Sequence, residues 1–116
     1  MAYVDGFLLA VPKDKKAEYT KMAKTCLDIW KEEYGLLAGK ECWGDDVPDG
    51  EHTSFPMAVK LEEGENVVFS WTIWPDKETR NNAWAKCQED ERFKNMDMAF
   101  DGKRMMWGGF EVLIEV

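Results

Sequence analysis

Residues 67–74 read VVFSWTIW, and this stretch decides the fold. β-Branched and aromatic residues dominate it, which is typical of a β-strand. Successive side chains of a strand point to opposite faces, so the odd-numbered residues oppose the even-numbered ones. Both sets are largely apolar. We therefore predict a strand that lies inside a sheet and has both of its faces covered.

A strand, a helix and another strand precede this stretch. Residues 3–11 are apolar with almost no interruption, so we expect a strand there. Apolar residues then recur at helical spacing over residues 19–34, with lysine and glutamate on the opposite face. Asp14 is placed to cap this helix, and Gly35 to end it. Residues 36–44 predict the second strand.

Turn-forming residues separate the remaining elements. Residues 45–56 predict a loop, and residues 57–61 a short extended piece that ends in a turn. Asp76 lies where a second helix should begin. Residues 105–116 predict the last strand. Inside it the pair Gly108-Gly109 indicates a bulge or a close approach of the backbone to another group.

The order strand, helix, strand, strand, helix, strand predicts an α+β fold. It is the ferredoxin-like βαββαβ arrangement, an antiparallel sheet with two helices on one face. A chain of 116 residues makes one domain, so residues 1–116 are taken as a single unit. Two helices leave the second, apolar face of the sheet uncovered. We therefore expect a two-fold homodimer whose sheets pack face to face.

Charge and apolar patterning exclude several partners. The chain carries 15 Lys and Arg against 23 Asp and Glu, a net charge of −8, which repels nucleic acid and anionic lipid. Residues 7–11 form the longest apolar run, far short of the roughly 20 residues of a membrane span. Cys26, Cys42 and Cys87 contain no CxxC spacing, so we expect reduced thiols in the cytoplasm.

Asp5 is the only charge within the first predicted strand. The first and third strands are central in this topology, so Asp5 should lie near Ser70 or Thr72. A buried carboxylate is costly unless it is hydrogen-bonded or neutralised. One interpretation is a satisfied structural network, or an Asp5 at the strand end that reaches solvent. The other is a semi-polar cavity in which Asp5 acts as acid or base and Ser70, Thr72 and Trp74 contact a ligand.

His52, the only histidine, lies in the acidic loop. It is a candidate general base, although a lone loop histidine is usually solvated. Residues 45–50 read DDVPDG, which supplies carboxylates but lacks the alternating ligand spacing of an EF-hand loop. We therefore expect no metal site there. The same acidic segment, residues 45–51, could instead serve as a protein-interaction surface.

Asp101 and Arg104 lie on a turn before the last strand. Arg104 could clamp a carboxylate or phosphate of a ligand with two hydrogen bonds. Alternatively it forms an ion pair with Asp101 or with an acidic residue of the loop. The sequence contains neither a glycine-rich phosphate loop nor a GxSxG elbow, and we expect no cofactor.

The chain resembles the YbaA-like bacterial proteins, a family of unknown function. The resemblance rests on YVDGF at residues 3–7, on GDDVPDG at 44–50 with TSFP at 53–56, and on FDGKRM at 100–105 with GGF at 108–110. It implies a ferredoxin-like fold in the dimeric α/β-barrel superfamily. Relatives there include cofactor-free quinol oxygenases, haem-degrading enzymes and muconolactone-isomerase-like proteins. None of their catalytic patterns matches residues of this chain.

Three functional hypotheses follow. The main one is a cytoplasmic homodimer that binds a small molecule, either between sheet and helices or between two sheets. The second is a cofactor-independent enzyme of oxygenase or isomerase type with Asp5 as acid or base, a class suggested only by analogy of fold. The third is a protein-interaction module.

Overall fold

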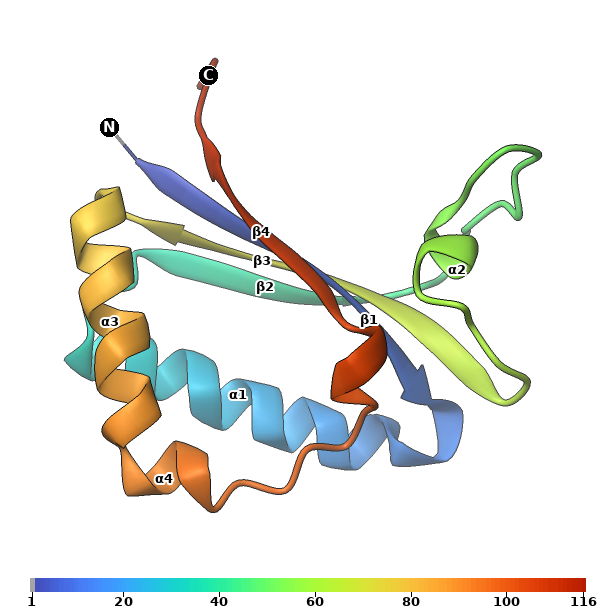
Figure 1. Ribbon diagram of the computed structural model, residues 1–116, viewed down its shortest axis with the longest axis horizontal. Helices are drawn as coiled ribbons and strands as arrows, with labels where there is room; N and C mark the ends of the chain where they lie inside the picture. Colours follow the sequence, from blue (N-terminus) through green and yellow to red (C-terminus); the bar gives the residue numbers. More distant parts are fainter. Residues whose placement is uncertain (1) are drawn as a thin grey trace.

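The computed structural model describes residues 2–116 and has the predicted α+β, ferredoxin-like architecture (Figure 1). A four-stranded antiparallel sheet carries its two long helices on one face. The elements along the chain are β1 (Tyr3–Pro12), η1 (Lys13–Lys15), α1 (Lys16–Glu33), β2 (Ala38–Trp43), α2 (Phe55–Ala58), β3 (Glu65–Trp74), α3 (Lys77–Glu89), α4 (Glu91–Lys94), η2 (Gly102–Arg104) and β4 (Met106–Glu111).

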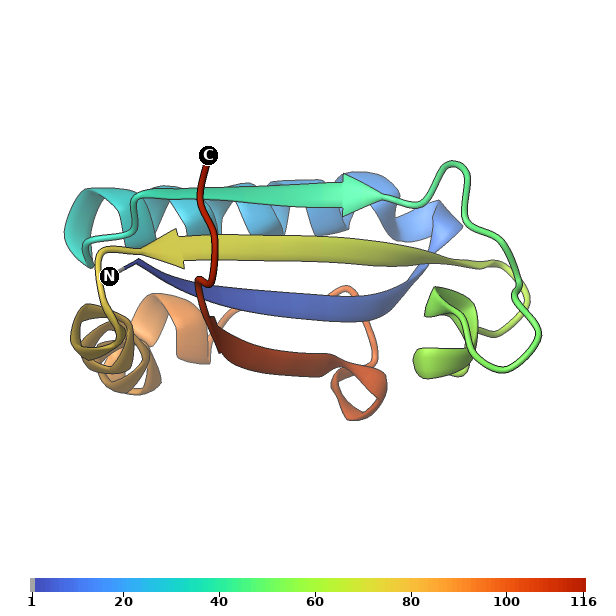
Figure 2. The same cartoon turned by 90° about the horizontal axis from the view of Figure 1, so that it is seen from above.

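The strands lie side by side in the order β2-β3-β1-β4, as the view from above shows (Figure 2). β1 and β3 are therefore the central strands, as predicted from the sequence. In the β1–β3 register Asp5 lies opposite Thr72, and in the β1–β4 register it lies opposite Gly109. β2 is an edge strand, with β3 as its only neighbour in the sheet.

The helix ends depart from the sequence prediction at one point. Asp14 does not cap α1, because it lies in the 3₁₀ turn η1, and the N-terminus of α1 at Lys15 has no side-chain cap. Gly35 adopts a left-handed φ of 87° after α1, as predicted. Asp76 caps α3, accepting a hydrogen bond from the Thr79 N–H at 2.7 Å.

The prediction of an extended piece at residues 57–61 was wrong, because this region begins as the short helix α2. The Ser54 side chain accepts a hydrogen bond from the Met57 N–H at 3.1 Å, which starts a helical turn that the local pattern did not suggest. After α2, Val59 packs against Ala10 and Val67 on the sheet face opposite α1. The connection between β2 and β3 thus covers one end of that face.

The last strand is shorter than predicted. β4 ends at Glu111, which pairs with Tyr3 at the start of β1, so the residues beyond it have no neighbouring strand. Leu113 and Ile114 follow as an extended tail and are 93% and 84% exposed. The register of β4 runs without a bulge through Gly109, where a Cβ atom would lie only 2.7 Å from the Tyr3 ring. The close backbone approach predicted for the glycine pair is confirmed at Gly109.

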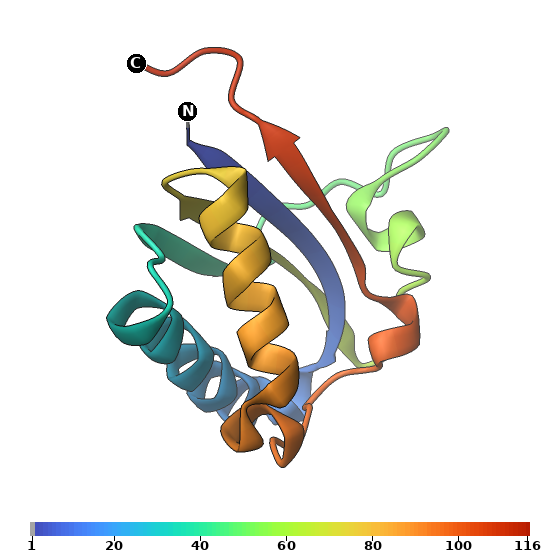
Figure 3. The same cartoon turned by 60° about the vertical axis from the view of Figure 1, so that its left-hand side comes forward.

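The core lies between the sheet and the helices (Figure 3). Leu9, Val11 and Val68 of the central strands pack against Tyr19 and Ala23 of α1. A second cluster joins Leu36, Trp74 and Ala83. In the part of the chain that the structure describes, no helix combines the length and the apolar character that crossing a bilayer would require.

The opposite face of the sheet is apolar and partly open. Phe69, whose ring packs edge-on against that of Phe55 in α2, is 45% exposed, and beyond it Met106 is 45% and Phe110 60% exposed. Phe69, Met106 and Phe110 border a shallow hollow of about 230 Å³ whose floor includes Gly6 and Gly108, which are partners in the β1–β4 register. Exposed aromatic side chains over a glycine-lined floor are the features of a contact surface.

Candidate functional site

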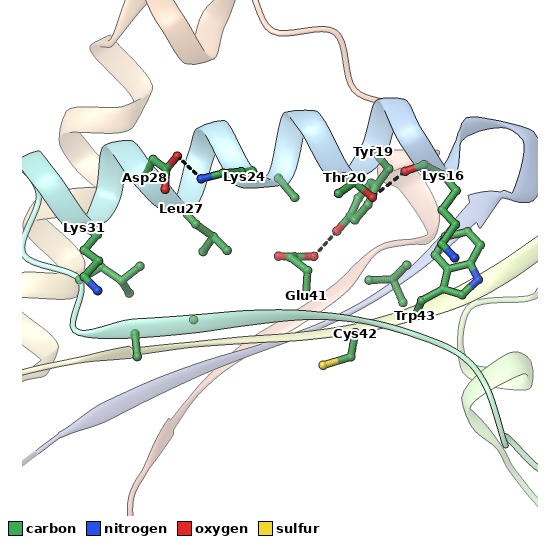
Figure 4. A pocket seen from close by; sticks show the side chains of 15 residues that line it. Lys16, Tyr19, Thr20, Lys24, Leu27, Asp28, Lys31, Glu41, Cys42 and Trp43 are labelled. Atoms are coloured by element: carbon green, nitrogen blue, oxygen red, sulfur yellow. Dashed lines mark hydrogen bonds and ion pairs between the residues drawn. The ribbon is translucent and has the colours of Figure 1, made fainter.

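A groove lies between α1 and the edge strand β2 (Figure 4). Its volume is about 430 Å³, within the range of small-molecule sites. It is open to solvent along the sheet edge, where β2 has no further strand beside it. The residues lining it are Lys16, Tyr19, Thr20, Ala23, Lys24, Leu27, Asp28, Lys31, Leu36, Ala38, Gly39, Glu41, Cys42, Trp43 and Val68.

Glu41 and Tyr19 meet across the middle of this groove. Glu41 points from β2 toward α1, whereas the adjacent Cys42 points away, as strand alternation requires (Figure 4). The Tyr19 hydroxyl donates a hydrogen bond of 2.5 Å to Glu41 Oε1. Burial raises the pKa of the Glu41 carboxyl, and hydrogen bonds from Tyr19 and Ser70 offset part of that rise. A carboxyl of this kind can act as a hydrogen-bond donor or a proton acceptor toward a ligand.

Tyr19 remains a phenol and therefore a hydrogen-bond donor. Its residue is only 5% exposed, and burial, followed by the charge of Glu41, raises its pKa well above the ordinary range for tyrosine. The Glu41–Tyr19 pair was missed in the sequence, where Glu41 stood out only as a charge within a strand. One signal could have found it: the side chain of Glu41 points to the helix side of the sheet, and the apolar face of α1 that carries Tyr19 points to the sheet.

Three lysines of α1 form the rim of the groove. Lys24 Nζ lies 2.8 Å from Asp28 Oδ2 and is neutralised by it. Lys16 Nζ lies 5.1 Å from the centre of the Trp43 ring, a cation–π contact. The ion pairs of residues 2–116 include neither Lys16 nor Lys31. The rim thus offers positive charge above an apolar wall.

Asp5 lies elsewhere, beneath α3, and is fully buried. Arg80 donates from Nε to both carboxylate oxygens at 3.1 Å and from Nη2 to Oδ1 at 2.8 Å. The guanidinium is covered in turn by aromatic rings, with its Cζ 4.1 Å from the Trp84 ring centre and 5.3 Å from that of Tyr3. Asp5 raises the pKa of Arg80 further, so the guanidinium keeps its charge.

The other predicted residues of the central strands are buried as well. Thr72 faces Asp5 across the β1–β3 register, as expected. The Trp74 indole N–H donates to Thr72 Oγ1 at 3.1 Å, and both side chains are at most 2% exposed. Ser70, equally buried, lies opposite Glu41 in the β2–β3 register. Asp5, Ser70, Thr72 and Trp74 are thus brought close together, but none of them lines the groove.

Asp101 and Arg104 lie at the far end of the sheet. Arg104 Nη2 is 2.6 Å from Glu65 Oε2, and its Nε is 3.1 Å from Asp101 Oδ2. Glu65 is the first residue of β3 and precedes Thr72 by seven residues. At roughly 3.3 Å per residue, Glu65 and Thr72 are about 23 Å apart along the strand. The predicted ligand residues are therefore divided between two places, and Arg104 is engaged in ion pairs with acidic neighbours.

The acidic connection before α2 holds the remaining candidates. His52 is exposed there, as are Asp45, Asp46 and Asp49. Over residues 2–116 the structure places no three His, Cys, Asp or Glu side chains where they could share a metal ion. The roles of His52 as a base and of residues 45–51 as an interaction surface stay predictions.

The fold is a ferredoxin-like α+β fold, with a groove between helix and sheet. Among solved structures it is similar to SnoaB, a cofactor-independent oxygenase from Streptomyces nogalater, with a TM-score of 0.63 and 11% identity. That match covers 99% of this chain and 96% of the other. It is also similar to the heme-degrader MhuD of Mycobacterium tuberculosis, with a TM-score of 0.58, 18% identity and 98% coverage of both chains. At these identities the likeness concerns the fold alone.

The sequence family is shown more directly. Residues 2–102 match the family described as "Protein of unknown function (DUF1428)". The uncharacterized protein YbaA of Escherichia coli K12 is 53% identical over 117 residues, covering 99% of each chain, and that of Shigella flexneri matches to the same extent. The chain belongs to this family, which confirms the resemblance found in its motifs.

Proposed function

We propose that this chain is a cytoplasmic homodimer that binds a small molecule in the groove between α1 and β2. The observation that carries the proposal is the Glu41–Tyr19 pair, a hydrogen-bonded polar group in the middle of a groove of about 430 Å³. A ligand site usually combines apolar walls with a small number of polar groups that orient the ligand. The three free cysteines agree with a reducing compartment.

The open face of the sheet supports the homodimer. Phe69 of β3 and Met106 and Phe110 of β4 lie on one face of the sheet, on the two strands that flank β1, and the exposed apolar tail continues from β4. One chain has no further element to cover them. A two-fold contact places the same face of two copies together, so the apolar patch of one copy packs against the same patch of the other.

A second candidate is a cofactor-independent enzyme of oxygenase or isomerase type. The neighbour SnoaB is an oxygenase of that kind, and its fold is the only link to such chemistry. Among the candidate acid–base groups, Glu41 opens to the groove, whereas Asp5 is fully buried and bound to Arg80, and His52 lies exposed in the loop before α2. If the chain catalyses a proton transfer, Glu41 is the group placed to contact the substrate.

Native mass spectrometry of the protein purified from its own cytosol tests both parts of the main proposal. We expect a mass of two chains and an additional small mass that is lost on denaturation. The matched variant Leu27→Trp, which fills the groove from α1, should keep the dimer and lose the additional mass. A single-chain mass would refute the homodimer, and a small mass retained by Leu27→Trp would refute the groove.

A further inference from the structure

The groove concentrates positive charge in an acidic protein. The chain as a whole carries −8, yet three lysines line the groove against two carboxyl groups, Asp28 and Glu41. Lys16, Lys24 and Lys31 lie eight and seven residues apart on one helix. At roughly 1.5 Å per residue they are spaced by about 12 and about 10 Å, so they follow the whole length of the groove.

Two of these lysines are free to meet a ligand. Asp28 holds Lys24, but Lys16 and Lys31 have no carboxylate oxygen within 4.0 Å among residues 2–116. Lys16 instead stands over the Trp43 ring, which fixes its position at one end of the groove. Lys31 lies toward the other end (Figure 4). An ammonium without a carboxylate partner attracts anions.

The surface between these charges is apolar. Half-buried Leu27 of α1 is the part of this wall that is open to solvent, and Ala23, Leu36 and Val68 line the groove behind it at 5% exposure or less. An inorganic anion would make no use of this wall, whereas a hydrocarbon chain or ring would remove it from water. The Glu41 carboxyl lies in the middle of the groove, where the Tyr19 hydroxyl donates to its Oε1 at 2.5 Å, and Lys16 and Lys31 lie toward the two ends (Figure 4).

We propose that the groove takes a small organic carboxylate with an apolar body. The carboxylate group meets Lys16 or Lys31, and the body lies on Leu27, Leu36 and Val68. This inference rests on the proposed function, since it names the ligand class of the same groove. A neutral polar group in the middle of the ligand would meet the Glu41–Tyr19 pair.

Matched acid and amide probes test the ligand class. Benzoate is compared with benzamide, and hexanoate with hexanamide, by following the backbone amide signals of residues 39–43 in ¹⁵N-labelled protein. We expect each acid to bind at least fivefold more tightly than its amide. That preference should weaken as salt is added, because it comes from charges near solvent.

Lysine variants locate the preference. In Lys16→Gln/Lys31→Gln the acids should bind no better than the amides, while the amides bind as before. Lys21→Gln makes the same change on α1 outside the groove and should leave the acid preference intact.

Three outcomes overturn the inference, and they separate it from the proposed function. Equal affinity for acid and amide refutes the carboxylate but keeps the groove as a binding site. An acid preference that survives Lys16→Gln/Lys31→Gln refutes the role of these lysines. If none of the four probes moves the signals of residues 39–43, while native mass spectrometry finds a ligand that Leu27→Trp retains, the groove itself is refuted.

Discussion

The guanidinium of Arg80 and the carboxylate of Asp5 form a buried ion pair, with Nη2 2.8 Å from Oδ1. The two residues are 75 positions apart, one on α3 and the other in the middle of the sheet. Asp5 is fully buried, and the Arg80 side chain is 11% exposed. Since Trp84 and Tyr3 cover the guanidinium, the pair fixes where α3 sits on the sheet.

Breaking this pair from one side should destabilise the fold strongly. Asp5→Asn leaves Arg80 charged under aromatic rings, and Arg80→Met leaves a buried carboxylate without a partner. Loss of one member of a buried pair costs about 3–5 kcal/mol. Urea denaturation followed by tryptophan fluorescence measures it. Lys24→Met, which breaks the exposed pair with Asp28, should cost less than about 1 kcal/mol. If Asp5→Asn is as stable as the parent, Asp5 does not anchor α3, and its role as an acid or base gains weight.

The close approach of Tyr3 to Gly109 gives a second prediction. A Cβ atom on residue 109 would lie 2.7–2.8 Å from the Tyr3 ring, so Gly109→Ala must displace the ring from Arg80. We expect a loss of about 1–3 kcal/mol in unfolding free energy, the usual range for overpacking. Gly102→Ala is the control, because no atom lies within 4 Å of its added Cβ. Equal stability of the two variants would show that Tyr3 moves aside freely.

The open sheet face gives a third prediction. Phe69→Glu places a charge at the centre of the proposed dimer contact, where the native side chain is 45% exposed. Sedimentation analysis should find a single chain for this variant and two chains for the parent protein. Met98→Glu is the matched control, since Met98 is similarly exposed at 47% but lies in the connection after α4. A dimer that tolerates Phe69→Glu would rule out this face as the contact.

Strand alternation predicted more of the fold than of the site. It identified the central strands and the burial of Asp5 near Thr72, because both depend on local patterns. The partner of Asp5 was not predictable, since Arg80 lies on a distant helix whose apolar stripe is narrow. α2 was missed because a single side-chain cap at Ser54 set its start. The groove depends on how α1 lies over the edge strand, which no spacing along the chain records.

Glu41 gives the last prediction, a pH dependence of stability. Its pKa is raised in the folded protein by burial, so folding favours the protonated carboxyl. The stabilisation is fully present below the unfolded pKa and is lost as the pH rises through the folded value. Glu41→Gln keeps a neutral side chain whose oxygen still accepts from Tyr19, and the Ser70 hydroxyl can turn to accept from the amide. We therefore expect the variant to melt at a higher temperature than the parent at pH 7, and the difference to shrink toward zero near pH 4.

Differential scanning calorimetry of the two proteins between pH 4 and pH 8 measures this difference directly. The difference between variant and parent isolates Glu41, because every other titrating group is common to both. Glu63→Gln makes the same change in an exposed turn and should give a difference that varies little with pH. A Glu41→Gln variant that melts below the parent at pH 7, with the gap closing in acid, would mean that the ionised carboxylate is the form the fold prefers.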